Sequence, residues 1–105
     1  MLRRGGNAVD AAVACAFSQG VVDPQMCGIG GFGAMQVCMP RRGVHTVLDF
    51  LARAPLAATE SMWADRFVGQ SRDGFVFLLS DHASEVGHLA AGTPGNVAGY
   101  AHALA

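Results

Sequence analysis

The chain has 105 residues, 51% hydrophobic and 14% charged, with a formal net charge of −1, which predicts one globular domain. All seven basic residues are arginine and they form no block, so the composition excludes a nucleic-acid partner and a polybasic membrane-binding surface. Cys15, Cys27 and Cys38 are odd in number and include no C-x-x-C pair. We therefore expect buried, reduced thiols rather than a disulfide framework or a zinc site, and no metal or cofactor.

The first predicted element is an alanine-rich helix from Ala8 to Gln19. Asn7 is expected to cap it, and Asp10 lies in the first turn, where the helix dipole favours an anion. Gly20 is a candidate breaker, although the helix can continue until Asp23-Pro24 stops it. Because nearly all of its residues are apolar, the helix is expected to be covered on nearly every side, in the core of a layered protein larger than this chain. It is too short to span a bilayer, which needs about 20 apolar residues.

Residues 28–33, GIGGFG, satisfy the G-x-G-x-x-G spacing of a dinucleotide-binding fingerprint. That motif requires a strand before it and a helix after it, so that the pyrophosphate lies at the helix N-terminus. Here a helix precedes the glycines, and a strand-like run from Ala34 to Met39 follows them. We therefore reject nucleotide binding and expect the glycines to permit positive backbone angles and close approach to another chain segment or to substrate.

A β-hairpin is predicted next, with strands at Ala34–Met39 and Val44–Leu51 joined by a turn at Pro40–Gly43. The second strand stops before Ala54-Pro55, because proline cannot donate a ladder hydrogen bond.

Alternation along the second strand predicts two different faces. One face is apolar and expected to pack, and it carries Val44, Thr46, Leu48 and Phe50. The other face carries His45, Val47, Asp49, Leu51 and Arg53. Arg53 beside Asp49 can be a structural ion pair or an anion clamp, and spacing alone favours the structural pair.

The remaining elements are shorter. We predict a helix from Glu60 to about Phe67 with Thr59 as its cap, and an apolar run at Phe75–Leu79 that fits a strand or a helix. A short extended segment is expected at His88–Ala91. The last element is a helix from Asn96 to Leu104 with Asn96 as the expected cap.

Four blocks of the chain closely resemble the gamma-glutamyltransferase (gamma-glutamyltranspeptidase) family, and they fall in the family's order. They are Asn7–Ala14, Gly28–Gly31, Leu48-Asp49-Phe50 through Ala54-Pro55, and Pro94-Gly95 with Val97-Ala98-Gly99. The resemblance implies an α+β fold class, as a fragment of the four-layer αββα sandwich of N-terminal-nucleophile hydrolases. It also implies that residues 1–105 are a partial N-terminal segment of the large subunit, a single incomplete domain.

The resemblance further implies a precursor that cleaves itself into a large and a small subunit. The threonine that then begins the small subunit is the nucleophile and its own amine is the base. The enzyme moves a gamma-glutamyl group from glutathione or a similar amide to water or an acceptor amine, through an acyl-enzyme. This chain lacks the threonine motif and the oxyanion-hole glycines, and Thr46, Thr59 and Thr93 have no such signature around them. We expect no catalytic residue here, no activity from this fragment alone, and the rest of the large subunit and the small subunit as partners.

One departure from the family bears on the substrate. Family members have an arginine directly after the Asp-Phe pair, where it binds the alpha-carboxylate of the glutamyl group, and here that position is Leu51. Arg53 lies two residues on and is our candidate substrate-binding residue. The alternative is a pocket for another acyl amide, since some relatives act on cephalosporin side chains or oxamate.

Other candidates are weaker. His45, His82, His88 and His102 lack metal-ligand spacing. Asp81-His82 with Ser80 and Ser84 imitates a hydrolase triad in composition only. Trp63 and Phe67 are expected to pack along a helix. A non-catalytic remnant or a structural or binding module remains the alternative function. No signal peptide is recognised, and the family includes exported, membrane-anchored and cytoplasmic proteins, so the compartment stays open.

Overall fold

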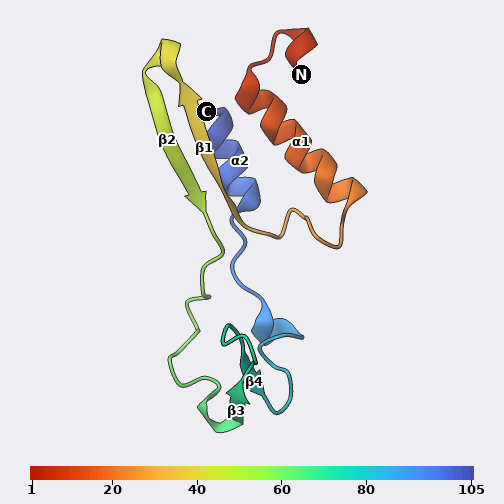
Figure 1. The fold of residues 1–105 in the computed structure, drawn as a ribbon, viewed down its shortest axis with the longest axis vertical. Helices are drawn as coiled ribbons and strands as arrows, with labels where there is room; N and C mark the ends of the chain where they lie inside the picture. The colour runs from red at the N-terminus through yellow and green to blue at the C-terminus, as the bar shows by residue number, and fades with distance from the viewer. The chain divides into compact units, whose positions relative to one another are not determined.

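The computed structural model describes residues 1–105 and contains both helices and antiparallel sheet, which confirms the α+β class (Figure 1). The chain divides into two compact units. The first unit comprises Met1–Arg53 and Pro94–Ala105, and the second unit comprises Ala54–Thr93. Each unit is described by itself.

Helix α1 runs from Ala8 to Val22 and has the cap that the sequence predicts. The Asn7 side-chain oxygen accepts hydrogen bonds from the amides of Val9 (2.7 Å) and Asp10 (3.1 Å). The Asp10 carboxylate in turn accepts from the Asn7 amide at 2.7 Å, which completes a capping box. Gly20 does not break the helix, which continues to Val22 before Asp23 ends it. A 3₁₀ turn at Leu2–Arg4 precedes α1.

Strands β1 (Gly33–Met39) and β2 (Val44–Phe50) form the predicted hairpin, with Gly33 opposite Phe50 and Met39 opposite Val44. The connection is a 3₁₀ turn at Pro40–Arg42. It is followed by Gly43 at φ 65°, a left-handed backbone conformation that glycine adopts more readily than residues with a side chain. The structure therefore confirms the hairpin and its turn, and it ends β2 one residue earlier than predicted.

Helix α2 (Asn96–Leu104) has the predicted bounds but a different N-terminus. Gly95 is the N-cap, and no side chain caps the helix. Asn96 is the first helical residue, and its side chain bonds to the carbonyl oxygen of Gly28 instead. The prediction of Asn96 as a cap is wrong because its side-chain amide donates its hydrogen bond to the distant Gly28 carbonyl oxygen instead.

The core of the first unit lies where α1, α2 and the hairpin meet (Figure 1). Its buried centre and the partly buried residues around it are Val9, Val13, Val37, Met35, Met39, Val44, Leu48, Tyr100 and Ala103. Val44, Leu48 and Phe50 are partly buried on the predicted apolar face of β2, whereas Thr46 is exposed. Edge-to-face contacts of Tyr100 with Phe17 and Phe50 extend the packing.

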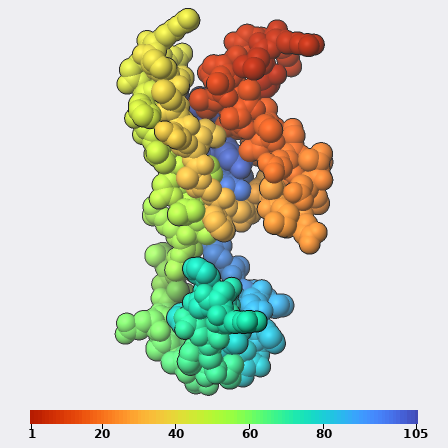
Figure 2. Space-filling view, viewed as in Figure 1, coloured from red at the N-terminus to blue at the C-terminus, as the bar shows by residue number.

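Most of α1 stays uncovered by residues 1–105. Only Val9 and Val13 of the helix are buried, and Val21 and Val22 are 80% exposed. In the space-filling view α2 (blue) is visible between α1 and the hairpin, and α2 is the helix that packs against α1 (Figure 2). The three cysteines are free as expected, but Cys15 and Cys38 are exposed, which corrects the prediction of burial. Neither helix has the length and apolar character that a membrane span requires.

The second unit contains the antiparallel strands β3 (Phe67–Gln70) and β4 (Phe77–Leu79), with an irregular register beside Phe67. Of the apolar run at residues 75–79, only Phe77–Leu79 is a strand, and Phe75 and Val76 precede it outside the ladder. The predicted helix at residues 60–67 is wrong: this segment consists of turns and a 3₁₀ turn at Ala64–Arg66. A helix this short forms few hydrogen bonds to offset the conformational entropy that its first turn costs. Backbone hydrogen bonds of the i→i+3 type form in this segment instead. The predicted extended segment at residues 88–91 is also wrong, because His88–Ala90 is a 3₁₀ turn.

Candidate functional site

The candidate site is the end of β2, where the chain leaves the hairpin. The Asp49 carboxylate accepts a hydrogen bond from the amide of Leu51 at 3.0 Å, immediately after the strand. Leu51 is 53% exposed and Arg53 is exposed as well. The structure has two ion pairs, Arg66–Asp81 and His82–Glu85, so the structural pair of Arg53 with Asp49 that the spacing favoured is absent and that prediction is wrong.

Three glycines hold Phe50, the last residue of β2. A Cβ atom on Gly99 would overlap the Phe50 ring, and one on Gly95 would overlap the Phe50 carbonyl group. A Cβ on Gly33 would lie 3.0 Å from the same ring. Only glycine lets β1 and α2 approach Phe50 this closely, and the end of the strand is thereby fixed.

The glycine loop (residues 28–33) is bonded to the start of α2. The carbonyl oxygen of Gly31 accepts from the amides of Gly95 at 3.1 Å and Asn96 at 3.2 Å. The Asn96 side-chain amide donates to the Gly28 carbonyl oxygen at 2.7 Å. A Cβ on Gly31 would lie 2.9 Å from the Asn96 side-chain nitrogen. The expected close approach is confirmed, but no glycine of this loop has a positive φ, so that part of the prediction is wrong.

A cavity of about 330 Å³ lies beside the glycine loop, between α1 and α2. Its lining residues are Ala16, Gln19, Met26, Cys27, Gly28, Gly31, Phe32, Asn96 and Tyr100. Neither Leu51 nor Arg53 is among them, so the cavity is separate from the exposed end of β2.

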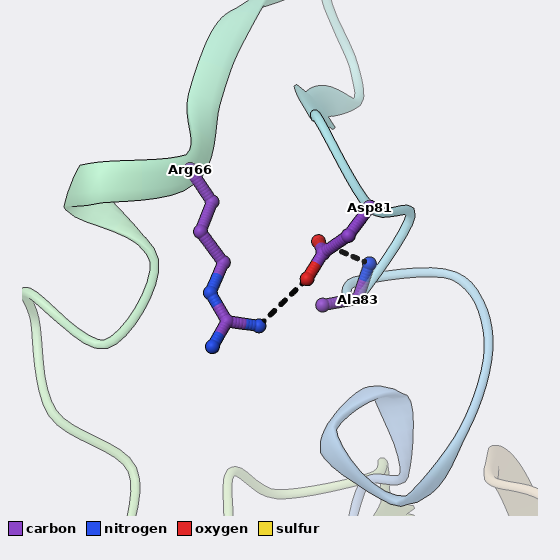
Figure 3. Close-up of polar contacts among 3 residues, drawn as sticks. All are labelled: Arg66, Asp81 and Ala83. Atoms are coloured by element: carbon purple, nitrogen blue, oxygen red, sulfur yellow. Dashed lines mark hydrogen bonds and ion pairs between the residues drawn. The ribbon is translucent and has the colours of Figure 1, made fainter.

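The triad-like cluster of the second unit is not arranged for catalysis, and Figure 3 shows the contacts that its Asp81 makes instead. The Asp81 carboxylate pairs with the Arg66 guanidinium at 2.8 Å and also accepts from the Ala83 amide at 3.1 Å. His82 lies instead 3.6 Å from Glu85. Asp81 therefore orients no histidine, and a half-exposed pair of this kind contributes about 0–1 kcal/mol of stability.

The other predicted candidates have ordinary surroundings. His45 lies 3.2 Å from the side-chain nitrogen of Gln36. No three or more His, Cys, Asp or Glu side chains gather as a metal site would require. Phe67 packs edge-to-face on Phe77 at 5.8 Å, and with no helix present it is not the helical neighbour of Trp63.

Sequence reasoning missed the role of Gly95, Asn96 and Gly99. The sequence does contain a pattern that could have revealed it. Two glycines four residues apart at the start of a predicted helix lie on one face and let another chain segment pack closely against that face.

The comparisons with known proteins agree with one another. A family described as Gamma-glutamyltranspeptidase matches the whole chain, residues 1–105. The chain is 44% identical over 103 residues to the "Glutathione hydrolase proenzyme" of Pseudomonas sp. (strain A14), covering 98% of this chain and 16% of the relative. It is 39% identical over 108 residues to the "Acylase ACY 1 proenzyme" of Pseudomonas sp. (strain SE83), covering 100% of this chain and 18% of that relative.

A solved structure is similar too. Helicobacter pylori gamma-glutamyltranspeptidase superposes with a TM-score of 0.77 at 41% identity, over 98% of this chain and 27% of that chain. The chain described here thus spans about a sixth of the length of the curated relatives and about a quarter of the solved one.

Proposed function

The chain belongs to the gamma-glutamyltranspeptidase family, and from this we propose that it is the N-terminal part of the large subunit of an enzyme that cleaves gamma-glutamyl amides such as glutathione. The acyl group passes to water or to an acceptor amine. The observation that carries this proposal is the match over all 105 residues, together with 44% identity to a glutathione hydrolase proenzyme. The partners are the rest of the large subunit and the small subunit, in a four-layer αββα sandwich.

The proposed chemistry uses a threonine outside residues 1–105. Its hydroxyl adds to the gamma-carbonyl of the donor and its own alpha-amine takes the proton. The amide C–N bond then breaks, the leaving amine receives the proton, and an ester to the threonine remains. Water or an acceptor amine attacks this ester and releases the acyl group. Residues 1–105 supply framework and substrate contact, and by themselves they catalyse nothing because nucleophile, base and oxyanion donors lie elsewhere.

We assign the substrate contact to Arg53. Its guanidinium is exposed, it has no ion-pair partner, and Asp49 is engaged with the Leu51 amide. The strand that leads to it is fixed through Phe50. A free guanidinium just beyond this fixed strand end can bind the alpha-carboxylate of a glutamyl donor as a charge-assisted pair.

Arg53→Leu in the natural gene product should therefore raise KM for acidic donors about 10- to 100-fold, the effect of losing one charged hydrogen bond of about 1.5–3 kcal/mol. The control is Arg72→Leu, which removes another exposed arginine, from a turn of the second unit. An unchanged KM in the Arg53 variant would remove this residue from the site.

A second candidate is cleavage of another acyl amide. Leu51 puts an exposed apolar side chain at the start of the segment that carries Arg53, and one relative at 39% identity is named an acylase. This alternative predicts that a donor without an alpha-carboxylate is cleaved at least as well as a gamma-glutamyl donor.

The experiment is a paired assay of the purified natural gene product with a gamma-glutamyl anilide and a neutral acyl anilide. Release of aniline and glutamate from the first supports the proposed function. Release from the neutral substrate alone favours the acylase alternative. Release from neither contradicts both and leaves a non-catalytic remnant or binding module.

A further inference from the structure

Asn96 is the one polar residue that the structure buries, with 7% of its surface exposed. Its side-chain nitrogen reaches across 68 residues of sequence to the Gly28 carbonyl oxygen. Its side-chain oxygen is buried with no hydrogen-bond partner. Reversing the amide would not help, because the oxygen would then face the Gly28 carbonyl oxygen at bonding distance.

A buried acceptor without a partner lowers stability, so stability alone does not explain an asparagine here. What the side chain does supply is position. Together with the two amides that donate to Gly31, it joins the first turn of α2 to the glycine loop by three hydrogen bonds. The start of the helix cannot shift or rotate without breaking them.

The same turn of α2 holds the end of β2. Gly95 precedes Asn96 directly and abuts the Phe50 carbonyl group, and Gly99, one turn on, abuts the Phe50 ring. Any displacement of this turn is therefore passed to Phe50, because the packing leaves no free space between them. Leu51 follows at once, and Arg53 lies three residues after Phe50.

We infer that Asn96 is a positioning residue. Its hydrogen bond fixes the start of α2 against the glycine loop, and this attachment determines the position from which Arg53 contacts the donor. The inference rests on the proposed function, since the substrate contact itself belongs to Arg53. Asn96 touches no substrate.

The test compares Asn96→Ala and Asn96→Asp with Asn7→Ala in the natural gene product. Asn96→Ala removes the donor, and Asn96→Asp keeps the shape but sets a carboxylate oxygen against the Gly28 carbonyl oxygen. Asn7→Ala is the matched control, since it deletes the same amide group and two hydrogen bonds at the other helix of the same unit. Lost positioning should raise KM for the gamma-glutamyl anilide about tenfold in Asn96→Ala and more in Asn96→Asp, with kcat changed less than about twofold. Asn7→Ala should leave KM within about twofold.

Hydrogen exchange of the peptide spanning residues 45–52 gives a readout that needs no activity. Both Asn96 variants should exchange faster there than the wild type, and Asn7→Ala should not. Equal exchange and equal KM in all three variants would overturn the inference. If the wild type cleaves no gamma-glutamyl amide, the proposed function fails, and the exchange experiment still decides whether Asn96 holds β2.

If neither Asn96 variant folds, Gly31→Ala is measured instead. Its Cβ would lie 2.9 Å from the Asn96 side-chain nitrogen and would therefore displace that side chain. Faster exchange at residues 45–52 in this variant supports the role of Asn96 in fixing the start of α2. Unchanged exchange there contradicts it.

Discussion

In the first unit, hydrogen bonds and close contacts join residues that are far apart in the sequence, whereas the hydrogen bonds of the second unit join residues close in sequence. Asn96 and Gly28 are 68 residues apart, while the side-chain bond of greatest separation in the second unit, Arg66 to Asp81, spans 15. The first unit has a 15-residue helix and two seven-residue strands, and the second has strands of four and three residues. Long-range glycine and amide contacts, more than local propensity, therefore define the part of this chain that carries the candidate site.

The largest expected effect comes from filling one of those glycine contacts. Gly99→Ala places a Cβ into the Phe50 ring and should destabilise the protein by about 1–3 kcal/mol, as overpacking does. The control is Gly69→Ala in β3, where the added Cβ meets nothing within 4 Å. Thermal unfolding of both variants of the natural product measures the difference. Equal melting temperatures would contradict the close packing of α2 on β2.

A smaller effect compares the two predicted helix caps. Asn7→Ala removes the bonds to the amides of Val9 and Asp10 and should cost about 1 kcal/mol. Thr59→Ala should change stability by less than about 0.5 kcal/mol, because turns rather than a helix follow it. Denaturant unfolding tests the pair, and a cost at Thr59 equal to that at Asn7 would show that a helix does form in the second unit.

The smallest effect is a titration in the second unit. The Ser71 hydroxyl and the Phe75 amide both donate to the Asp73 carboxylate, and these bonds hold the pKa of Asp73 below its usual 3.8. A carboxyl with a lowered folded-state pKa stabilises the fold above the unfolded pKa, and this contribution is lost as pH falls through the folded pKa. Ser71→Ala should raise the pKa of Asp73 towards 3.8, as measured by carboxyl NMR. An identical titration in the variant would show that the serine bond is absent in solution.

Sequence patterns predicted the first unit well because its local signals agree with its packing. Asn7 with Asp10 and the turn at Pro40–Gly43 each have one strong local solution, and the structure adopts both. The alternation along β2 is kept at Val44, Leu48 and Phe50 but not at Thr46, which is exposed. The cap at Asn96 was mispredicted because local rules favour an asparagine there, while its true partner, Gly28, is distant in sequence. The helix at residues 60–67 was mispredicted because a single short apolar stripe cannot outweigh the cost of starting a helix.

The candidate site was predictable in part. Periodicity predicted Asp49 and Arg53 on one face of one strand, but β2 ends at Phe50 and Arg53 lies beyond it. Periodicity also could not foresee that Asp49 would bond to the Leu51 amide and leave Arg53 without an ion-pair partner. The role of Arg53 in binding substrate stays a prediction.

The most direct test of the proposed function is the intact mass of every chain of the natural gene product, with the N-terminal residue of each chain identified. The proposed function predicts two chains from one precursor, the smaller beginning with threonine, and a larger chain that contains residues 1–105. A single unprocessed chain of 10.9 kDa would contradict it.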